Sequence, residues 1–184
     1  GTLYGRNTIG GAIKYVTKRL NPDSSEGNIR ASYGTDNMLD LVLTGSVPLG
    51  ETFRIGASVA SFNRDGFGDN LNLKGVENYN KDVLGARFSA EWEPNDDWFL
   101  RFAADYVEDD SDPRQGHRLY PATISGNPVL KNVYDTESGL NNPAQSVEAK
   151  GFSLLAEWNV SDLITFKNIL SSRDDESWTP IDFD

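Results

Sequence analysis

The densest group of residues that could do chemistry is the acidic run Glu108-Asp109-Asp110-Ser111-Asp112. Carboxylate oxygens are ligands that Ca²⁺ prefers, so a run of this kind could hold the ion. The EF-hand pattern is not met, because the glycine and the bidentate glutamate do not follow at the required offsets. An acidic, solvent-exposed loop is the preferred interpretation, and no metal site is predicted.

The sequence contains few residues of the types that act in catalysis. The chain has no cysteine and a single histidine, His117. Thiol nucleophiles, thiolate zinc sites and multi-histidine metal sites therefore lack their ligands, and a Ser-His-Asp triad has no supporting motif. Serine, aspartate and histidine do not fall into a hydrolase pattern. The sequence predicts no catalytic residue, no cofactor and no enzyme.

The net charge argues against one kind of partner, and the hydropathy excludes one kind of membrane segment. The 184 residues carry a formal net charge of −11, which argues against nucleic acid because phosphate binding needs clustered Lys and Arg. Mean hydropathy is −0.51, and no apolar run approaches the ~20 residues of a membrane helix. A membrane β-barrel escapes this test, because only every second residue faces lipid. The lack of cysteine suits an exported bacterial protein.

Period-two alternation of apolar and polar residues is the main structural signal. Between residues 83 and 92, for example, Leu84, Phe88 and Trp92 share one face. Such alternation indicates strands with one apolar face. The predicted strands are 28–33, 39–47, 53–62, 83–92, 98–106, 152–160 and 163–172. We therefore expect an all-β fold, an antiparallel up-and-down transmembrane β-barrel of which about seven strands are present.

Aromatic residues stand at the strand ends of the apolar face. Trp92, Trp98 and Trp158 adjoin short turns, and Tyr106 lies eight residues after Trp98. That separation is about 27 Å along a strand. Tilted by ~40°, it spans about 20 Å of the membrane normal, near the height of an apolar band flanked by aromatic girdles. These four residues are predicted to be membrane-girdle aromatics.

Connection lengths also alternate. Short breaks at 48–52, 93–97 and 160–162 fall on one side of the predicted sheet, and long connections at 63–81 and 108–147 fall on the other. The break at 34–38 is the exception on the long side. Short periplasmic turns and long extracellular loops are typical of outer-membrane barrels. A soluble β-sandwich would give similar alternation within its strands, and so the alternative is a soluble all-β ligand- or carbohydrate-binding module.

A glycine-rich segment opens the chain. It reads Gly1-Thr2-Leu3-Tyr4-Gly5-Arg6-Asn7-Thr8-Ile9-Gly10-Gly11-Ala12-Ile13, and residues 12–18 could continue as a short strand. A phosphate-binding loop is disfavoured because no Lys-Ser/Thr follows the glycines. The segment resembles the end of the plug domain of TonB-dependent outer-membrane receptors. The residues that carry this resemblance are Gly1, Leu3, Tyr4, Gly5, Arg6, Asn7, Gly10 and Gly11.

The resemblance implies a domain organisation and a function. Residues 1–20 would be the C-terminal end of a plug, and residues 21–184 the first third of a barrel of about 22 strands. The implied activity is uptake of a scarce nutrient, in the first place a ferric siderophore, across the outer membrane of a Gram-negative bacterium. The implied partners are outer-membrane lipid and the TonB energy-transduction complex. TonB would act through a box that this sequence does not contain.

The resemblance also suggests roles for individual residues. Plug arginines in the family pair with barrel glutamates, so Arg6 is expected to meet Glu91 or Glu157, which face inward by parity. A contact of Arg6 within the plug is the alternative. A second set in the loop at 108–147 could contact an anionic iron chelate; the preferred alternative is that these are ordinary loop residues. This set is Arg114, His117, Arg118, Tyr120 and Tyr134.

Overall fold

All regular structure in the described part of the chain is β-strand. The computed structural model describes residues 16–112, 116–137, 139–140 and 145–181. The long strands are β1 (Glu26–Tyr33), β2 (Leu39–Pro48), β3 (Phe53–Arg64), β6 (Lys81–Asn95), β7 (Trp98–Asp109), β8 (Ser146–Ser161) and β9 (Ile164–Trp178). Two short strands, β4 (Gly68–Asp69) and β5 (Glu77–Asn78), form a small separate sheet within one connection.

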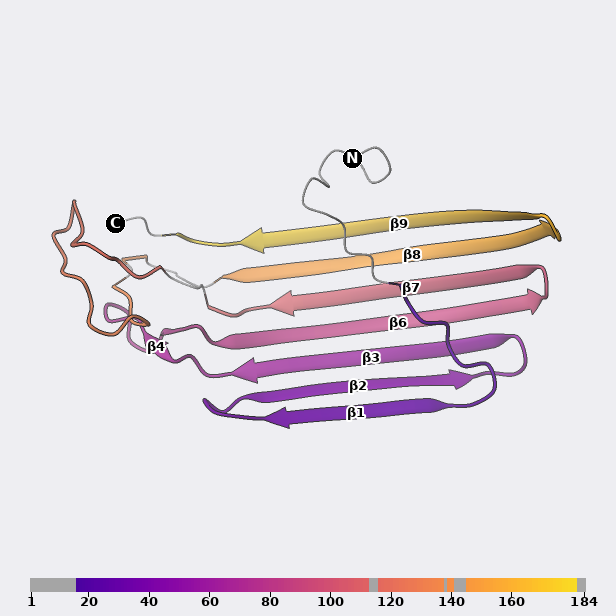
Figure 1. Ribbon diagram of the computed structural model, residues 1–184, viewed down its shortest axis with the longest axis horizontal. Helices are drawn as coiled ribbons and strands as arrows, with labels where there is room; N and C mark the ends of the chain where they lie inside the picture. The colour runs from indigo at the N-terminus through magenta and orange to yellow at the C-terminus, as the bar shows by residue number, and fades with distance from the viewer. Residues whose placement is uncertain (1–15, 113–115, 138, 141–144, 182–184) are drawn as a thin grey trace.

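The seven long strands form one antiparallel sheet in the order β1-β2-β3-β6-β7-β8-β9 (Figure 1). The predicted all-β class and the seven antiparallel strands are confirmed. The sheet is open, with β1 and β9 at its edges, so the described residues form no closed barrel. The plug signature within residues 1–13 lies outside the described residues. Of the short strand predicted at 12–18, residues 16–18 have no regular structure.

The strand register gathers the apolar side chains on one face. Phe102 of β7 is paired with Ala90 of β6 and Leu154 of β8, and Leu154 is paired with Leu170 of β9. Directly paired residues project from the same face of a sheet, so this apolar row crosses four strands. The face is uncovered in the described structure. Six of its larger side chains are between 39% and 60% exposed: Leu43, Val59, Phe88, Phe102, Leu154 and Leu170.

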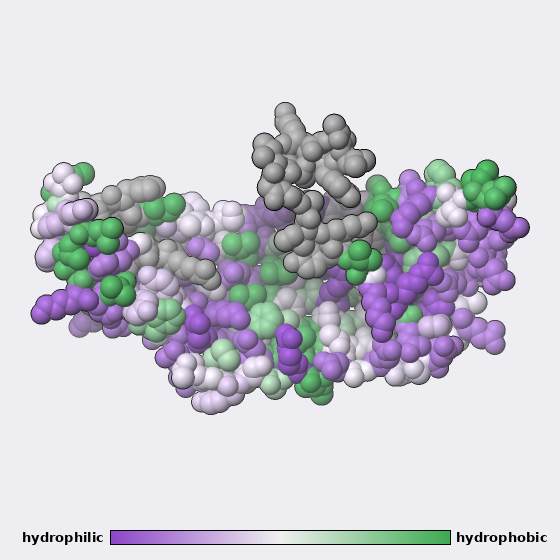
Figure 2. Space-filling model, viewed as in Figure 1, coloured by the Kyte–Doolittle hydropathy of each residue, from purple (hydrophilic) through white to green (hydrophobic). Residues whose placement is uncertain are grey.

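The opposite face is polar, and it holds most of what is buried. Phe99 and Ala103 are the buried apolar side chains in the described residues. Buried beside them are the polar residues Arg54, Ser89 and Glu91. Figure 2 shows this face, with hydrophilic residues over most of it and smaller hydrophobic patches between them. The described sheet therefore buries polar groups and exposes apolar ones, the reverse of the usual distribution in a soluble domain.

Several strands run beyond their predicted ends. β8 begins at Ser146, although the apolar alternation starts at residue 152, and β9 continues to Trp178 rather than residue 172. The added residues are paired in the ladder, as Glu148 is with Glu176. Ladder hydrogen bonds join backbone groups and do not depend on apolar side chains. Alternation therefore marked the apolar part of each strand rather than the whole strand.

Connections at the two ends of the sheet differ in length, as predicted (Figure 1). The short connection between β1 and β2 is explained by its turn. Asp36 and Asn37 have positive φ values of 57° and 52°, and the Met38 N–H donates to the Thr35 carbonyl at 3.2 Å. Positive φ at both central residues is what a type I′ hairpin turn requires, and Asp and Asn tolerate it.

This turn gives a test of the fold. Replacing Asp36 by valine puts a β-branched residue at positive φ and should cost about 1–2 kcal/mol of unfolding free energy, whereas Asp36→Gly should cost little. Denaturant unfolding in detergent micelles would measure both. Asp162→Val is the control, because Asp162 in the β8–β9 turn is not among the residues with positive φ. Equal losses for the two valine variants would contradict the assignment.

Candidate functional site

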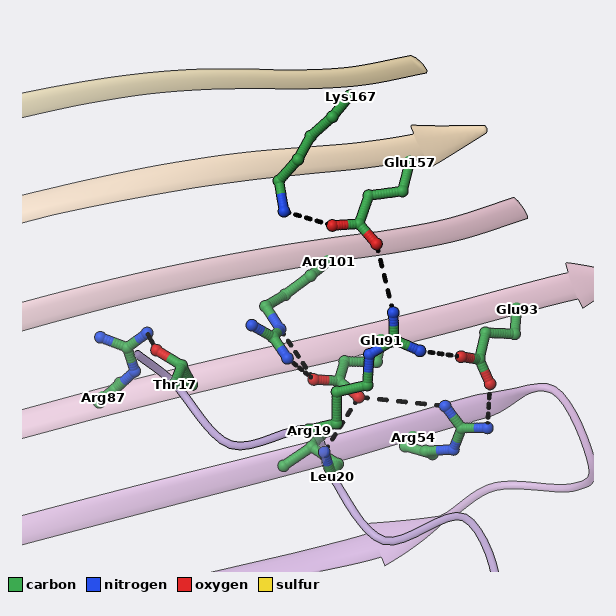
Figure 3. Close-up of polar contacts among 10 residues, drawn as sticks. All are labelled: Thr17, Arg19, Leu20, Arg54, Arg87, Glu91, Glu93, Arg101, Glu157 and Lys167. Carbon is green, nitrogen blue, oxygen red and sulfur yellow. Dashed lines mark hydrogen bonds and ion pairs between the residues drawn. The ribbon is translucent and has the colours of Figure 1, made fainter. Parts of the chain in front are cut away.

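The segment of residues 16–25, called here the N-terminal segment, lies across the polar face of the sheet (Figure 1). Arg19 donates to Glu93 of β6 at 3.0 Å and to Glu157 of β8 at 3.2 Å. The backbone N–H of Leu20 donates to Glu91 Oε2 at 3.0 Å. These contacts join an irregular stretch of chain to strand residues more than seventy positions away, and so they define the candidate site (Figure 3).

Arg19 is positioned by an aromatic ring as well as by charge. Its guanidinium carbon lies 3.9 Å from the centroid of the Phe99 ring, which is itself buried. A guanidinium is planar, carries several donors and stacks on aromatic faces. It can therefore rest on Phe99 and still bridge two carboxylates on different strands. A lysine ammonium has the charge but not the flat, forked geometry.

The contacts extend into an alternating chain of charges, called here the ionic chain. Its order is Lys167, Glu157, Arg19, Glu93, Arg54, Glu91 and Arg101. Every two consecutive residues in this order form an ion pair. Cations and carboxylates therefore alternate along the ionic chain from β9 to β7. Arg19 is the one member that comes from the N-terminal segment. It links the pair on β8 and β9 to the group on β3, β6 and β7 (Figure 3).

Glu91 is the buried centre of the ionic chain. It is 1% exposed and receives hydrogen bonds from Arg101 Nε at 2.8 Å and from the Leu20 N–H. Arg101 Nη2 lies 2.6 Å from Glu91 Oε1, and Arg54 Nη1 lies 3.9 Å from Oε2. A buried carboxylate is tolerated when it is paired with cations and fully hydrogen-bonded. The arrangement can anchor a segment non-covalently, and it contains no nucleophile-base pair.

The acidic run at 108–112 does not converge on a cation site. Glu108 accepts a hydrogen bond from the Tyr106 hydroxyl at 3.1 Å, and Asp109 accepts one from the Ser111 N–H at 3.0 Å. Burial raises the pKa of the Asp112 carboxyl above its ordinary value, and the negative charge of Glu77 adds to the rise. Within the described residues, His, Cys, Asp and Glu form no group of three that could hold a metal ion.

Both predicted carboxylates, Glu91 and Glu157, contact the N-terminal segment. Glu91 and Glu157 both belong to the ionic chain, and their contact from the N-terminal side is made by Leu20 and Arg19. Arg6 lies outside the described residues, so its pairing stays a prediction. Alternation could have indicated Arg54, Arg101 and Lys167 as inward-facing. The position of Arg19 in an irregular segment carried no comparable signal.

The four predicted girdle aromatics lie on the apolar face. Trp98 and Trp158 are paired across β7 and β8, and their rings are stacked with centroids 5.2 Å apart. Trp92 is paired with Leu100 at the same end of the sheet. Tyr106 lies toward the other end, and its hydroxyl donates to Glu108 at 3.1 Å and to Glu148 at 3.4 Å. The apolar face thus ends at an aromatic residue followed by charged ones.

The predicted loop residues have separate surroundings. Arg118 is paired with Glu137 at 2.7 Å, and Tyr134 packs against Phe67 and Tyr79 of the connection between β3 and β6. Tyr120 is 80% exposed. His117 is described in the same connection, and Arg114 lies outside the described residues. Their contact with a ligand stays a prediction.

Comparisons with known proteins identify no relative of this chain. No family model, curated protein or solved structure matches this chain. No helix in the described residues is long and apolar enough to cross a membrane.

The burial of Glu91 can be tested by truncation. Glu91→Ala would leave Arg101 and one side of Arg54 without a counter-charge, which should cost about 3–5 kcal/mol of unfolding free energy. Glu157→Ala is the matched control, because Lys167 and Arg19 are each more than half exposed and can be hydrated. Its cost should stay within about 1 kcal/mol. Urea unfolding in detergent would measure both, and similar costs would refute the buried centre.

The anchoring of the N-terminal segment can be tested from the wall side, without changing the segment. Glu93→Gln combined with Glu157→Gln removes both carboxylate partners of Arg19. Thermolysin cleavage before Leu20 should then become roughly fivefold faster, since partly exposed ion pairs contribute up to about 1 kcal/mol. Glu148→Gln is the control, because Glu148 is paired with Lys150 away from the segment. Unchanged cleavage in the double variant would show that the ion pairs do not hold the segment.

Proposed function

We propose that this chain is part of a TonB-dependent outer-membrane transporter, covering the end of its plug and the first strands of its barrel. The observation that carries the proposal is the inverted polarity of the sheet. Apolar side chains such as Phe102 and Leu154 are exposed on one face, while Glu91 is buried on the other. A barrel wall in lipid has this arrangement, because the outward face meets acyl chains and the inward face is polar.

The limits of the apolar face support a membrane rather than a protein partner. The band runs from Trp98 to Tyr106, about 27 Å along β7. From the level of Tyr106 onward, the same face of β3, β6 and β8 carries polar residues: Lys150, directly opposite Tyr106, is paired with Glu148 at 2.8 Å, and further along Asn63 donates to Asp82 at 3.2 Å. An apolar belt closed by aromatic residues and then by charges follows the profile of a bilayer. In lipid, the open edges at β1 and β9 would need further strands to pair with.

The contacts between the polar face and the N-terminal segment are of a kind that would let the segment move. The ionic chain fastens the N-terminal segment through ion pairs and hydrogen bonds rather than through a large apolar contact. Charged contacts that reach water can exchange partners as a segment shifts, whereas packed apolar contacts resist such sliding. The proposed cargo, a ferric siderophore in the first place, and the proposed energy source, TonB, rest on the resemblance of residues 1–13 to the plug signature.

Membrane placement can be tested with neighbouring residues on opposite faces. In the complete gene product that contains this chain, Leu154→Arg should lower assembly in the outer membrane, because a lipid-facing arginine costs about 2–4 kcal/mol near the bilayer midplane. Ser153→Arg, one residue away on the polar face, should be tolerated. Assembly is measured as heat-modifiable, protease-resistant protein. A monomeric chain that unfolds cooperatively in plain buffer would instead favour a soluble all-β binding module.

Transport needs its own measurement. Deletion of the gene should abolish growth of the host on its ferric siderophore as the sole iron source, and the wild-type gene should restore it. Radiolabelled iron uptake would report the same loss directly. An outer-membrane protein whose deletion leaves the uptake of ferric siderophores, haem and cobalamin unchanged would contradict the transport function without touching the membrane placement.

A further inference from the structure

The two long connections at the outer end of the sheet are joined to one another. The first is residues 65–80, between β3 and β6, and it contains β4 and β5. The second is residues 110–145, between β7 and β8. Their contact, called here the loop clamp, lies around Gly68, Asn78 and Tyr134. Sequence alternation gave no sign of it, because neither connection has a repeating pattern.

Backbone hydrogen bonds make part of the second connection an extra strand on the first. The Thr136 N–H donates to the Asp69 carbonyl at 2.9 Å, and the Leu71 N–H donates to the Thr136 carbonyl at 2.8 Å. Asn70 and Thr136 form a parallel β-bridge. Backbone pairing of this kind fixes one segment against another without regard to side chains. The small β4–β5 sheet is thus extended by a residue from a distant loop.

Asn78 holds the clamp from inside. Its side chain is 3% exposed, and its Nδ2 donates to Thr136 Oγ1 at 3.0 Å and to the Asp69 carbonyl at 3.1 Å. The Tyr134 carbonyl lies 3.4 Å from the same nitrogen. One amide therefore serves acceptors in both connections. Removing it would take this donor from the buried Thr136 Oγ1, while the Asp69 carbonyl would keep the Thr136 N–H. Loss of a buried hydrogen bond is costlier than loss of an exposed one.

The two connections also approach each other too closely for a side chain at residue 68. A Cβ added to Gly68 would lie 2.1 Å from the Tyr134 carbonyl oxygen, a backbone atom. Close backbone approach of this kind is a role that glycine fills because it has no Cβ. The contact is therefore built into the backbone rather than formed by side chains that could turn away.

Aromatic packing completes the clamp. The rings of Phe67 and Tyr79 are stacked with centroids 4.9 Å apart, and Tyr134 meets them edge-on at 5.1 Å and 6.0 Å. Tyr79 has φ of 66°, a conformation that bulky residues rarely adopt and that persists when the surroundings enforce it. The Tyr79 carbonyl accepts a hydrogen bond from Arg64 at the end of β3, so the clamp is tied to the wall.

We propose that the loop clamp makes residues 66–79 and 133–137 a single rigid body, so that these two segments open and close together. Anything that binds one connection then acts on the other. The shared polar centre at Asn78, the backbone bridge at Asn70 and the close approach at Gly68 each cross between the two connections, which is why neither can leave alone. This coupling stands on these contacts and does not depend on the proposed transport function.

Hydrogen exchange on the full chain in detergent tests the coupling. In the wild-type protein, amides of residues 66–79 and 133–137 that are hydrogen-bonded across the clamp should exchange through one shared opening, with protection within about threefold and parallel dependence on urea. Asn78→Ala should raise exchange in both segments by roughly tenfold. Thr136→Val keeps the side-chain shape but loses the hydroxyl. Although it lies in the second connection, it should also raise the exchange rate of amides in residues 66–79.

Controls separate coupling from general loosening. Asn127→Ala changes the same residue type in the second connection, outside the clamp, and should leave residues 66–79 unaffected. Amides of β3 and β6 should keep their protection in every variant. Effects confined to the mutated connection, or wild-type segments that open with different urea dependence, would overturn the proposal. The wild-type measurement decides the question even if a variant folds poorly.

Discussion

The strand register is the constraint on which the rest of this structure depends. A slip of one residue in any pair would turn that strand's apolar side chains to the opposite face. The pairing of Ala90, Phe102, Leu154 and Leu170 keeps parity across β6 to β9. Because alternate residues of a strand share a face, the same register places Arg54, Glu91 and Arg101 on the polar face, where they form ion pairs. The apolar face and the ionic chain are thus two consequences of one register.

Burial divides the ionic chain into parts with different roles. Glu91 is enclosed with Arg101 and Arg54, so its pairs are costly to break and hold β3, β6 and β7 together on their polar side. Arg19, Glu157 and Lys167 reach solvent, where ion pairs are weaker and screened by salt. The three strands are therefore held firmly, while the N-terminal segment is held by weaker ion pairs that reach solvent.

The two ends of the sheet differ in the length of the connections between their strands. Near Trp92, Trp98 and Trp158, consecutive strands are joined by a few residues, and little chain is free of the ladder (Figure 1). At the other end, long connections leave the ladder and must satisfy their backbone groups elsewhere. The loop clamp does this through the Asn70–Thr136 bridge and the buried Asn78 side chain. The described parts of these connections are thus held by each other as well as by the sheet.

The sequence by itself determined the strands, their order and the face that each side chain occupies, because period-two alternation follows directly from strand geometry. It placed Trp98 and Trp158 beside short turns on the apolar face and turned Glu91 and Glu157 to the opposite one. It missed the polar ends of β8 and β9, since backbone pairing there needs no apolar residue. Only the tertiary structure decided that Arg19 bridges Glu93 and Glu157 and that Asn78 reaches Thr136. Those contacts join residues far apart in the chain, and no local pattern encodes which irregular segments meet.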